Sequence, residues 1–231
     1  MGDAFVGLYL HGSLVLGDFA PERSDIDFIV ATAERLTTDQ VTRLAAFHAH
    51  LAATDNPWAR RLEGSYIPTA ALWRYDPAHA VHPAVRVGGQ FGMDGHGSDM
   101  VLQTHVLREH GVAWAGPQPV TLVARVDAQA LCAAQRATLQ DWWAPQLLDP
   151  HRLLAREYQA YALLTMCRAR YTLEFGRVVS KPVAAAWAKT QLDPAFHPVI
   201  DRALAWPTPP QPDDLAATLA LIRATLDVAR V

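Results

Sequence analysis

Several residue types and patterns are scarce or missing in this chain of 231 residues. It has only two cysteines, Cys132 and Cys167, so a disulfide is possible but not required, and a reducing compartment is the default expectation. No run of Lys and Arg occurs and the net charge is −3, which argues against a nucleic-acid partner. No apolar run reaches the roughly 20 residues of a membrane span, and no signal peptide is recognisable. The sequence therefore predicts a cytoplasmic protein that binds neither nucleic acid nor membranes.

Common catalytic motifs are missing as well. The chain has ten histidines, yet they form no H-E-x-x-H or Cys/His zinc pattern, and no G-x-S-x-G elbow occurs. These absences argue against a zinc enzyme and against a serine hydrolase of the usual type. We expect surface or capping roles for the histidines on predicted helices, which are His48, His50, His105 and His110.

The first part of the chain alternates between strand and helix patterns. Short β-rich runs predict strands at residues 5–11, 26–31 and 61–68, and helical spacing of apolar residues predicts helices at 37–53 and 98–110. Residues 76–97 are rich in Gly, His and Pro without a clear period, and predict loops around a groove. His82 and His96 in these loops are candidates for contact with a substrate. The pattern is typical of an α/β domain.

The second part of the chain is rich in Ala, Leu and other helix formers. We expect helices near residues 127–143, 150–175, 181–191, 195–206 and 213–230. The proline-rich segment 207–214 predicts a connector whose aspartates cap the last helix. The sequence thus predicts two domains, an α/β domain at residues 1–120 and an all-α helical bundle at residues 121–231.

The stretch LYLHGSLVLGDFAPERSDIDFIV, residues 8–30, holds the most informative pattern. Side chains two apart on a strand share a face, so Asp25 and Asp27 are expected to project together. Two adjacent carboxylates form a hard-oxygen site that suits Mg²⁺. Gly12 and Ser13 follow a strand, where backbone N–H groups and a hydroxyl can cradle phosphate oxygens. The alternative is that Asp25 caps a turn and Asp27 pairs with an arginine at a sheet edge.

This stretch resembles the signature of the nucleotidyltransferase superfamily that includes DNA polymerase beta. The shared features are Gly-Ser, an intervening Gly, and then Ser24 followed by Asp-x-Asp. In that superfamily a third carboxylate comes from a neighbouring strand, and Glu63 in RRLEGSYIP is in the corresponding place. The alternative for Glu63 is a surface side chain in an ion pair with a nearby arginine.

The resemblance extends to bacterial aminoglycoside nucleotidyltransferases, and within them to streptomycin/spectinomycin adenylyltransferases. It is strongest at residues 8–30, 99–117 and 163–189. It implies a polymerase beta-like α/β domain followed by a helical domain, and transfer of AMP from ATP to a hydroxyl of a small molecule with release of pyrophosphate. In these relatives an arginine and a lysine contact the triphosphate, and Arg168 and Lys181 match them. The sequence also predicts that Lys181 lies in a first helical turn, where anions are favoured.

These arguments together predict two Mg²⁺ ions and ATP as the co-substrate. The expected catalytic residues and metal ligands are Asp25, Asp27 and Glu63. The expected nucleotide-binding residues are Gly12, Ser13, Ser24, Arg168 and Lys181.

The acceptor side departs from the family pattern. Streptomycin-type relatives have a tryptophan after Q-F-G, where this chain has Met93 and Asp94. The first long helix of the second domain presents different residues, namely Glu157, Tyr158 and Tyr161. The predicted acceptor is therefore an aminoglycoside or aminocyclitol, but these departures argue against both streptomycin and spectinomycin. The alternatives are a nucleotidyltransferase that acts on a protein or another metabolite, and a relative that binds ATP without turnover.

Overall fold

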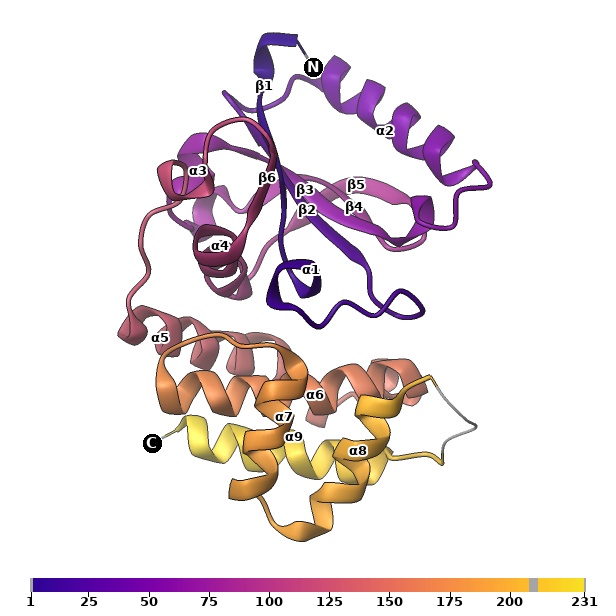
Figure 1. Cartoon of the computed structure of the whole chain (residues 1–231), viewed down its shortest axis with the longest axis vertical. Coiled ribbons are helices and arrows are strands. Elements are labelled where there is room, and N and C mark those ends of the chain that lie inside the picture. The colour runs from indigo at the N-terminus through magenta and orange to yellow at the C-terminus, as the bar shows by residue number, and fades with distance from the viewer. Residues whose placement is uncertain (1, 208–211, 231) are drawn as a thin grey trace. The chain divides into compact units, whose positions relative to one another are not determined.

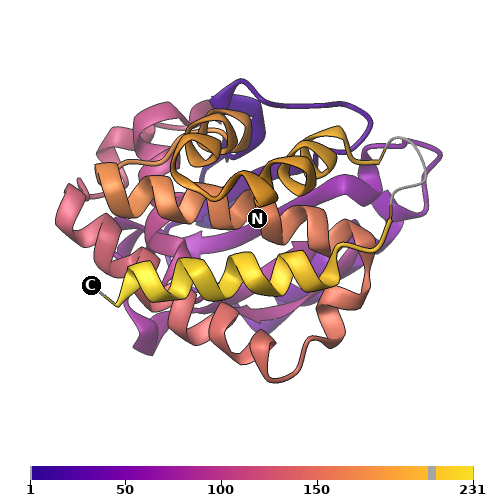
Figure 2. The ribbon, with the colours of Figure 1, turned by 90° about the horizontal axis from the view of Figure 1, so that it is seen from below.

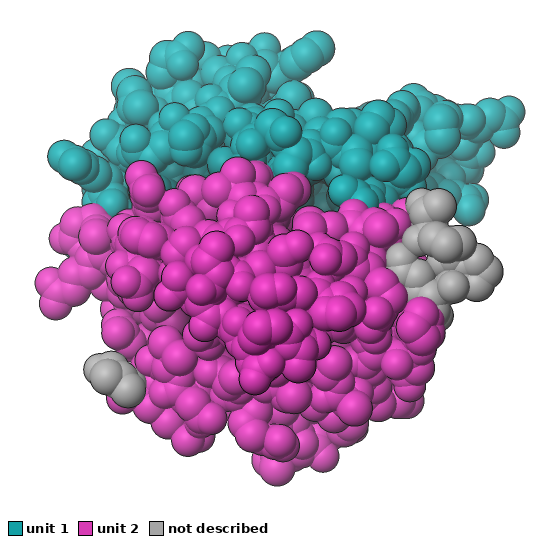
Figure 3. All heavy atoms as spheres, turned by 60° about the horizontal axis from the view of Figure 1, so that its bottom comes forward, with its two compact units in different colours: residues 1–126 teal, residues 127–231 magenta. Residues whose placement is uncertain are grey.

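The computed structural model describes residues 2–207 and 212–230 and divides the chain into two compact units, Met1–Val126 and Asp127–Val231 (Figures 1 and 3). The strands are β1 (Phe5–Leu10), β2 (Ile26–Thr32), β3 (Leu62–Pro68), β4 (Val81–Arg86), β5 (Gln90–Gly95) and β6 (Val112–Ala115). The α-helices of the first unit are α1 (Ser13–Leu16), α2 (Thr38–Ala52), α3 (Thr69–Trp73) and α4 (Asp99–His110). Those of the second unit are α5 (Ala128–Thr138), α6 (Arg156–Phe175), α7 (Lys181–Gln191), α8 (His197–Ala205) and α9 (Leu215–Ala229).

Short helical segments connect these elements. A π-helical turn, Leu139–Trp143, follows α5 directly. The 3-10 segments are Gly2–Ala4, Ala59–Arg61, Pro77–His79, Pro119–Thr121, Ala144–Leu147, His151–Leu154 and Pro194–Phe196. No helix in the described part of the chain is long and apolar enough to cross a membrane. Cys132 and Cys167 are both free thiols.

The first unit is built on one mixed sheet with the strand order β5-β4-β3-β2-β1-β6. Strands β2 and β3 are parallel, and the other neighbouring pairs are antiparallel. Alternation along the strands sends Ile29 and Ile67 to one face, where they pack with α3 and α4 residues such as Leu72. It sends Val30 to the opposite face, where Leu44 of α2 covers the sheet. The sheet thus buries both faces and holds its central strands rigidly.

Helix α2 begins and is anchored by specific polar contacts. Thr37 forms a capping box with Gln40, whose N–H donates to the Thr37 hydroxyl at 3.3 Å. Near the other end of α2, His48 is buried and its Nε2 lies 2.7 Å from the hydroxyl of Tyr66 on β3. Burial lowers the pKa of His48, so the ring is neutral near pH 7. The prediction of a surface or capping role for His48 was therefore wrong.

Helix α6 is the centre of the second unit, where it packs against α5, α7, α8 and α9 (Figure 2). Its buried side chains, such as Leu163 and Met166, join Ile200 of α8 and Leu221 of α9 in one apolar core. The predicted strands and helices occur in the predicted order, but the structure also contains the short helices α1 and α3 and the strand β6, which the sequence did not predict. Residues 76–97, expected to be loops, contain the hairpin of β4 and β5. The proline-rich segment falls partly on residues 208–211, which lie outside the described residues.

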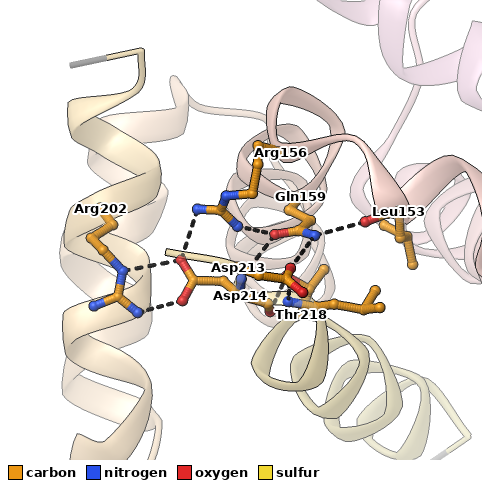
Figure 4. A network of polar contacts seen from close by, with 8 residues as sticks. Leu153, Arg156, Gln159, Arg202, Asp213, Asp214 and Thr218 are labelled. Carbon is orange, nitrogen blue, oxygen red and sulfur yellow. Dashed lines mark hydrogen bonds and ion pairs between the residues drawn. The ribbon is translucent and has the colours of Figure 1, made fainter. Parts of the chain in front are cut away.

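A buried network of charged side chains holds the start of α9 (Figure 4). Asp214 is buried and accepts hydrogen bonds from Arg202 at 2.5 and 3.0 Å and from Arg156 at 3.1 Å. The N-cap residue of α9 is Asp214, whose side chain makes no capping hydrogen bond, whereas Asp213, one residue earlier, accepts from the N–H of Leu215 at 3.0 Å. Burial opposes ionisation of Asp214, but the hydrogen bonds from the two arginines outweigh it and lower its pKa.

We expect Asp214→Asn to lower the free energy of unfolding by about 3 kcal/mol near pH 7, because it leaves two arginines facing a neutral side chain. The exposed pair of Asp227 and Arg230, 3.3 Å apart, provides a control, and Asp227→Asn should cost less than about 1 kcal/mol. Because the pKa of Asp214 is lowered by folding, its contribution is complete above about pH 4 and is lost at lower pH. Urea unfolding of both variants at pH 7 and pH 3 measures this, and equal losses in the two variants would refute it.

Candidate functional site

The glycine that follows strand β1 lies directly against a carboxylate of strand β2. Gly12 has a φ of 65°, a left-handed value that residues with a Cβ rarely adopt. A Cβ built on Gly12 would collide with the carboxylate of Asp27. The N–H of Leu16 donates to the Gly12 carbonyl at 3.2 Å and closes the short helix α1, which begins at Ser13. The structure thus places the predicted phosphate cradle next to Asp27.

Gly12→Ala should disturb this contact, whereas Gly17→Ala provides a matched control. Gly17 also has a left-handed φ, 76°, but a Cβ there meets no atom within 4 Å. Gly17→Ala should therefore cost only the conformational penalty, about 1 kcal/mol. Gly12→Ala should cost more and should also weaken Mg-ATP binding, because the carboxylate of Asp27 must move. Thermal unfolding and calorimetric titration with Mg-ATP measure both effects. Equal stability and equal ATP affinity in the two variants would contradict the role of Gly12.

Two of the predicted carboxylates lie side by side on parallel strands. Asp27 of β2 is in register with Glu63 of β3, and neighbouring strands are about 4.8 Å apart. Asp25 precedes the first residue of β2 and is half-buried, like Asp27, whereas Glu63 is exposed. Adjacent like charges disfavour ionisation unless a positive charge lies near them. The pair of Asp27 and Glu63 is therefore suited to a cation.

The question whether the predicted carboxylates form a metal site can be asked of the described residues. Among residues 2–207 and 212–230, no group of three or more His, Cys, Asp or Glu side chains is arranged to hold a metal ion. The prediction that Asp25, Asp27 and Glu63 together ligate Mg²⁺ therefore stays a prediction. The donor chemistry fits it, since carboxylate oxygens are the ligands that Mg²⁺ prefers.

A buried histidine that the sequence argument did not single out ties the Gly12 turn to strand β2. The N–H of His11 donates to the Asp27 carbonyl at 3.1 Å. Burial lowers the pKa of His11 to about 4, and a hydrogen bond with the backbone of Phe28 only partly opposes this shift. The imidazole is therefore neutral near pH 7. The sequence did contain a signal for this role, because His11 is a polar residue at the end of a predicted strand. A polar side chain that is buried there needs a hydrogen-bond partner.

The loop between α1 and β2 is held by its own polar contacts. Ser24, predicted to orient phosphate oxygens, accepts from the N–H of Ala20 at 2.9 Å, and its own N–H donates to the Ala20 carbonyl at 2.7 Å. Arg61 donates to the Pro21 carbonyl, and its guanidinium lies 5.2 Å from the ring centroid of Trp58. Ser24 thus shapes the turn that precedes Asp25, and its contact with phosphate stays a prediction.

The predicted triphosphate ligands Arg168 and Lys181 both belong to the second unit. Arg168 is half-buried in the middle of α6. Lys181 is the first residue of α7, after the extended N-cap residue Ser180, as the sequence predicted. Its Nζ lies 4.8 Å from the ring centroid of Tyr161 on α6. This end of α7 combines a cation with the positive end of a helix dipole, an arrangement that favours anions.

The residues of the β4–β5 hairpin divide between the two ends of the sheet. Asp94 forms an ion pair with Arg86 at 2.5 Å, and the neighbouring Met93 is exposed. His82 is buried near the start of β4, with its ring centroid 5.6 Å from that of His96, and burial lowers its pKa to about 4. Because β4 runs antiparallel to β3, its start lies at the end of the sheet opposite Asp27 and Glu63. The histidine pair therefore lies apart from the carboxylates. The backbone of Arg86 is at the carboxylate end of the sheet, but its guanidinium pairs with Asp94, which is in register with His82.

A family model and several relatives agree with the resemblance to aminoglycoside nucleotidyltransferases. Residues 121–229 match the family model described as "Aminoglycoside adenylyltransferase, C-terminal domain". The "Aminoglycoside (3'') (9) adenylyltransferase" of Klebsiella pneumoniae is 28% identical over 213 residues, which cover 84% of this chain and 75% of that protein. The "Spectinomycin 9-adenylyltransferase" of Staphylococcus aureus (strain N315) is 26% identical over 198 residues, which cover 81% of this chain and 72% of that protein.

A solved structure shares the fold of nearly the whole chain. It is the spectinomycin adenyltransferase AAD(9) from Enterococcus faecialis with ATP and spectinomycin, which matches with a TM-score of 0.75. The match covers 98% of this chain and 93% of that one at 16% sequence identity, and at this identity it shows the fold alone. The family model matches the second part of the chain, and the relatives match most of its length. The chain is therefore similar in sequence to aminoglycoside adenylyltransferases.

Proposed function

We propose that the chain is a Mg²⁺-dependent enzyme that transfers AMP from ATP to a hydroxyl of an aminoglycoside or aminocyclitol, with release of pyrophosphate. The observation that carries this proposal is the register of Asp27 and Glu63 on parallel strands, with Gly12 packed against Asp27. Residues 1–120 would form a polymerase beta-like nucleotidyltransferase domain and residues 121–231 a helical domain. The family match in the second part of the chain supports this division.

Each residue of the first unit has a defined task in this proposal. Asp25 and Asp27 would hold Mg²⁺, which would supply positive charge to the phosphates. Gly12 and Ser13 offer backbone N–H groups and a hydroxyl to the phosphate oxygens. Ser24 keeps the loop before Asp25 in its turn and adds a further hydroxyl. His11 fixes this turn to the backbone of β2.

Glu63 is the proposed general base. It accepts the proton of the acceptor hydroxyl. The alternative role for Glu63 is that it would be a third ligand of the cation. The hydroxyl oxygen attacks the α-phosphorus, a new oxygen–phosphorus bond forms, and the bond to pyrophosphate breaks. Arg168 and Lys181 stabilise the negative charge on the departing pyrophosphate. The exposure of Glu63 leaves its carboxylate accessible to an acceptor.

The proposed acceptor is argued from the names of the relatives and from the residues in which this chain differs from streptomycin-type relatives. The relatives' names point to aminoglycosides and spectinomycin. In this chain the strand β5 presents Met93 and an aspartate paired with Arg86 instead of the tryptophan of streptomycin-type relatives. Met93 and the neutral ion pair of Arg86 and Asp94 do not reproduce that tryptophan contact. We therefore propose an aminoglycoside or aminocyclitol acceptor that is bound through contacts other than those of the streptomycin-type relatives.

A panel assay tests the proposed function. Purified protein is incubated with Mg²⁺, ATP labelled in the α-phosphate and single aminoglycosides or aminocyclitols. Pyrophosphate release and transfer of label to the antibiotic are measured together. We expect transfer to at least one member of the panel and none without Mg²⁺. If label instead moves to a protein or metabolite in cell extract, the acceptor assignment is wrong. If ATP binds and no label moves anywhere, the chain is a binding protein and not an enzyme.

A further inference from the structure

An aromatic ring in the second unit holds the lysine that is proposed to bind the triphosphate. The Nζ of Lys181, at the start of α7, lies 4.8 Å from the ring centroid of Tyr161 on α6. Cations within about 6 Å of a ring centroid are attracted by the negative face of the ring. Lys181 itself is half-buried, so water screens this attraction less than it would on an open surface. The contact joins two helices that are neighbours in the core of the unit.

The ring of Tyr161 is itself fixed by an aromatic cluster, which we define as Trp142, Trp143, Tyr158 and Tyr161. The ring centroid of Tyr161 lies 6.0 Å from that of Trp143, which is 1% exposed, and 5.5 Å from that of Tyr158. The indole N–H of Trp142 donates to the hydroxyl of Tyr158 at 3.1 Å. Offset and tilted aromatic pairs at these distances are stabilising. The cluster therefore limits the movement of the ring under Lys181.

We propose that Tyr161 is a positioning residue for the nucleotide, because it holds the ammonium group of Lys181 in place for the triphosphate. This inference rests on the proposed function. It assigns a role on the nucleotide side to Tyr161, which lies on the helix where the sequence does not reproduce the acceptor contacts of the relatives. A ring attracts an ammonium without carrying a formal charge, so this contact does not compete with phosphate for the positive charge. An ammonium group has three N–H donors, so a lysine can contact the face of a ring and donate to an anion at the same time.

Binding measurements on three variants test the inference. We expect Tyr161→Leu to raise the Kd for Mg-ATP about three- to tenfold, a range typical of losing one partly exposed cation–π contact. Tyr161→Phe keeps the ring and should stay within about twofold of the wild type. Lys181→Met removes the charge and should weaken binding further. The double variant Tyr161→Leu/Lys181→Met should bind no more weakly than Lys181→Met alone, because the ring acts through the lysine. The KM for the acceptor should not change in Tyr161→Leu.

Phe175 provides a control for a general loss of packing, because it is an exposed ring on the same helix that packs against Trp187 instead. Phe175→Leu should leave the Kd for Mg-ATP unchanged. Additive losses in the double variant, or a Tyr161→Leu effect on the acceptor KM alone, would overturn the inference. So would an unchanged Kd in Tyr161→Leu while Lys181→Met weakens binding, and in that case the proposed function stands. A wild-type chain that binds no Mg-ATP would overturn both.

Discussion

Asp27→Asn is expected to abolish AMP transfer and Mg²⁺-dependent ATP binding while the protein stays folded. Asp27 lies in register with Glu63 and against Gly12, so its carboxylate is the one that the structure places most firmly in the proposed site. Asparagine has nearly the same shape and can keep the packing against Gly12. It lacks the negative charge that a divalent cation requires from its ligands. The loss should therefore appear in binding and turnover and not in the unfolding temperature.

Asp39→Asn is the matched control for this experiment. Asp39 lies on the exposed side of α2, where it pairs with Arg43 at 2.8 Å. An exposed pair of this kind contributes less than about 1 kcal/mol, so activity and stability should both stay close to the wild type. Calorimetric titration with ATP, with and without Mg²⁺, measures the difference. Unchanged Mg-ATP affinity in Asp27→Asn would overturn the assignment of Asp27 as a metal ligand. Asp25→Asn should behave in the same way as Asp27→Asn.

Glu63→Gln is expected to separate ATP binding from chemistry. If Glu63 accepts the proton of the acceptor hydroxyl, its amide analogue should still allow Mg-ATP to bind. Turnover should fall about a hundred- to ten-thousandfold, the range typical of losing a general base. Glu63 is exposed on strand β3, so the substitution should leave the unfolding temperature unchanged. The measurements are the Kd for Mg-ATP and the kcat for AMP transfer to an accepted antibiotic.

Glu174→Gln, at an exposed position on α6, controls for the loss of one negative charge. It should not change the kcat. Full turnover in Glu63→Gln would exclude Glu63 as the base. A loss of Mg-ATP affinity equal to that of Asp27→Asn would instead make Glu63 mainly a ligand of the metal.

The helices and strands whose apolar residues recur at a regular spacing could be predicted from the sequence. Helix 181–191 agrees with α7 at both ends, because Ser180 and Pro182 mark its start. The hairpin of β4 and β5 was missed for a physical reason. Its strands contain Pro83, Asp94 and two glycines, Gly92 and Gly95, and these residues have low strand propensity. Tertiary pairing with β3 overrides that local preference, and pairing partners are not visible in the local sequence.

In the candidate site, too, local sequence patterns could be predicted, whereas contacts between distant elements could not. The Gly-Ser turn and the Asp-x-Asp pattern point to a phosphate and metal site, and the structure places Gly12, Asp27 and Glu63 together. The roles of His11 and Tyr161 depend on contacts between elements that are distant in the sequence. His11 bonds to the backbone of β2, and Tyr161 contacts Lys181 on another helix. Such contacts require the tertiary structure, because no short-range pattern encodes them.

The location of the divalent cation tests the central claim most directly. Crystals grown with Mn²⁺ in place of Mg²⁺ and a non-hydrolysable ATP analogue would show the metal by its anomalous scattering. We predict that manganese lies between the carboxylates of Asp25 and Asp27 and the phosphates, with metal–oxygen distances of about 2.1 Å. Nucleotide bound with its metal away from both aspartates would contradict the claim.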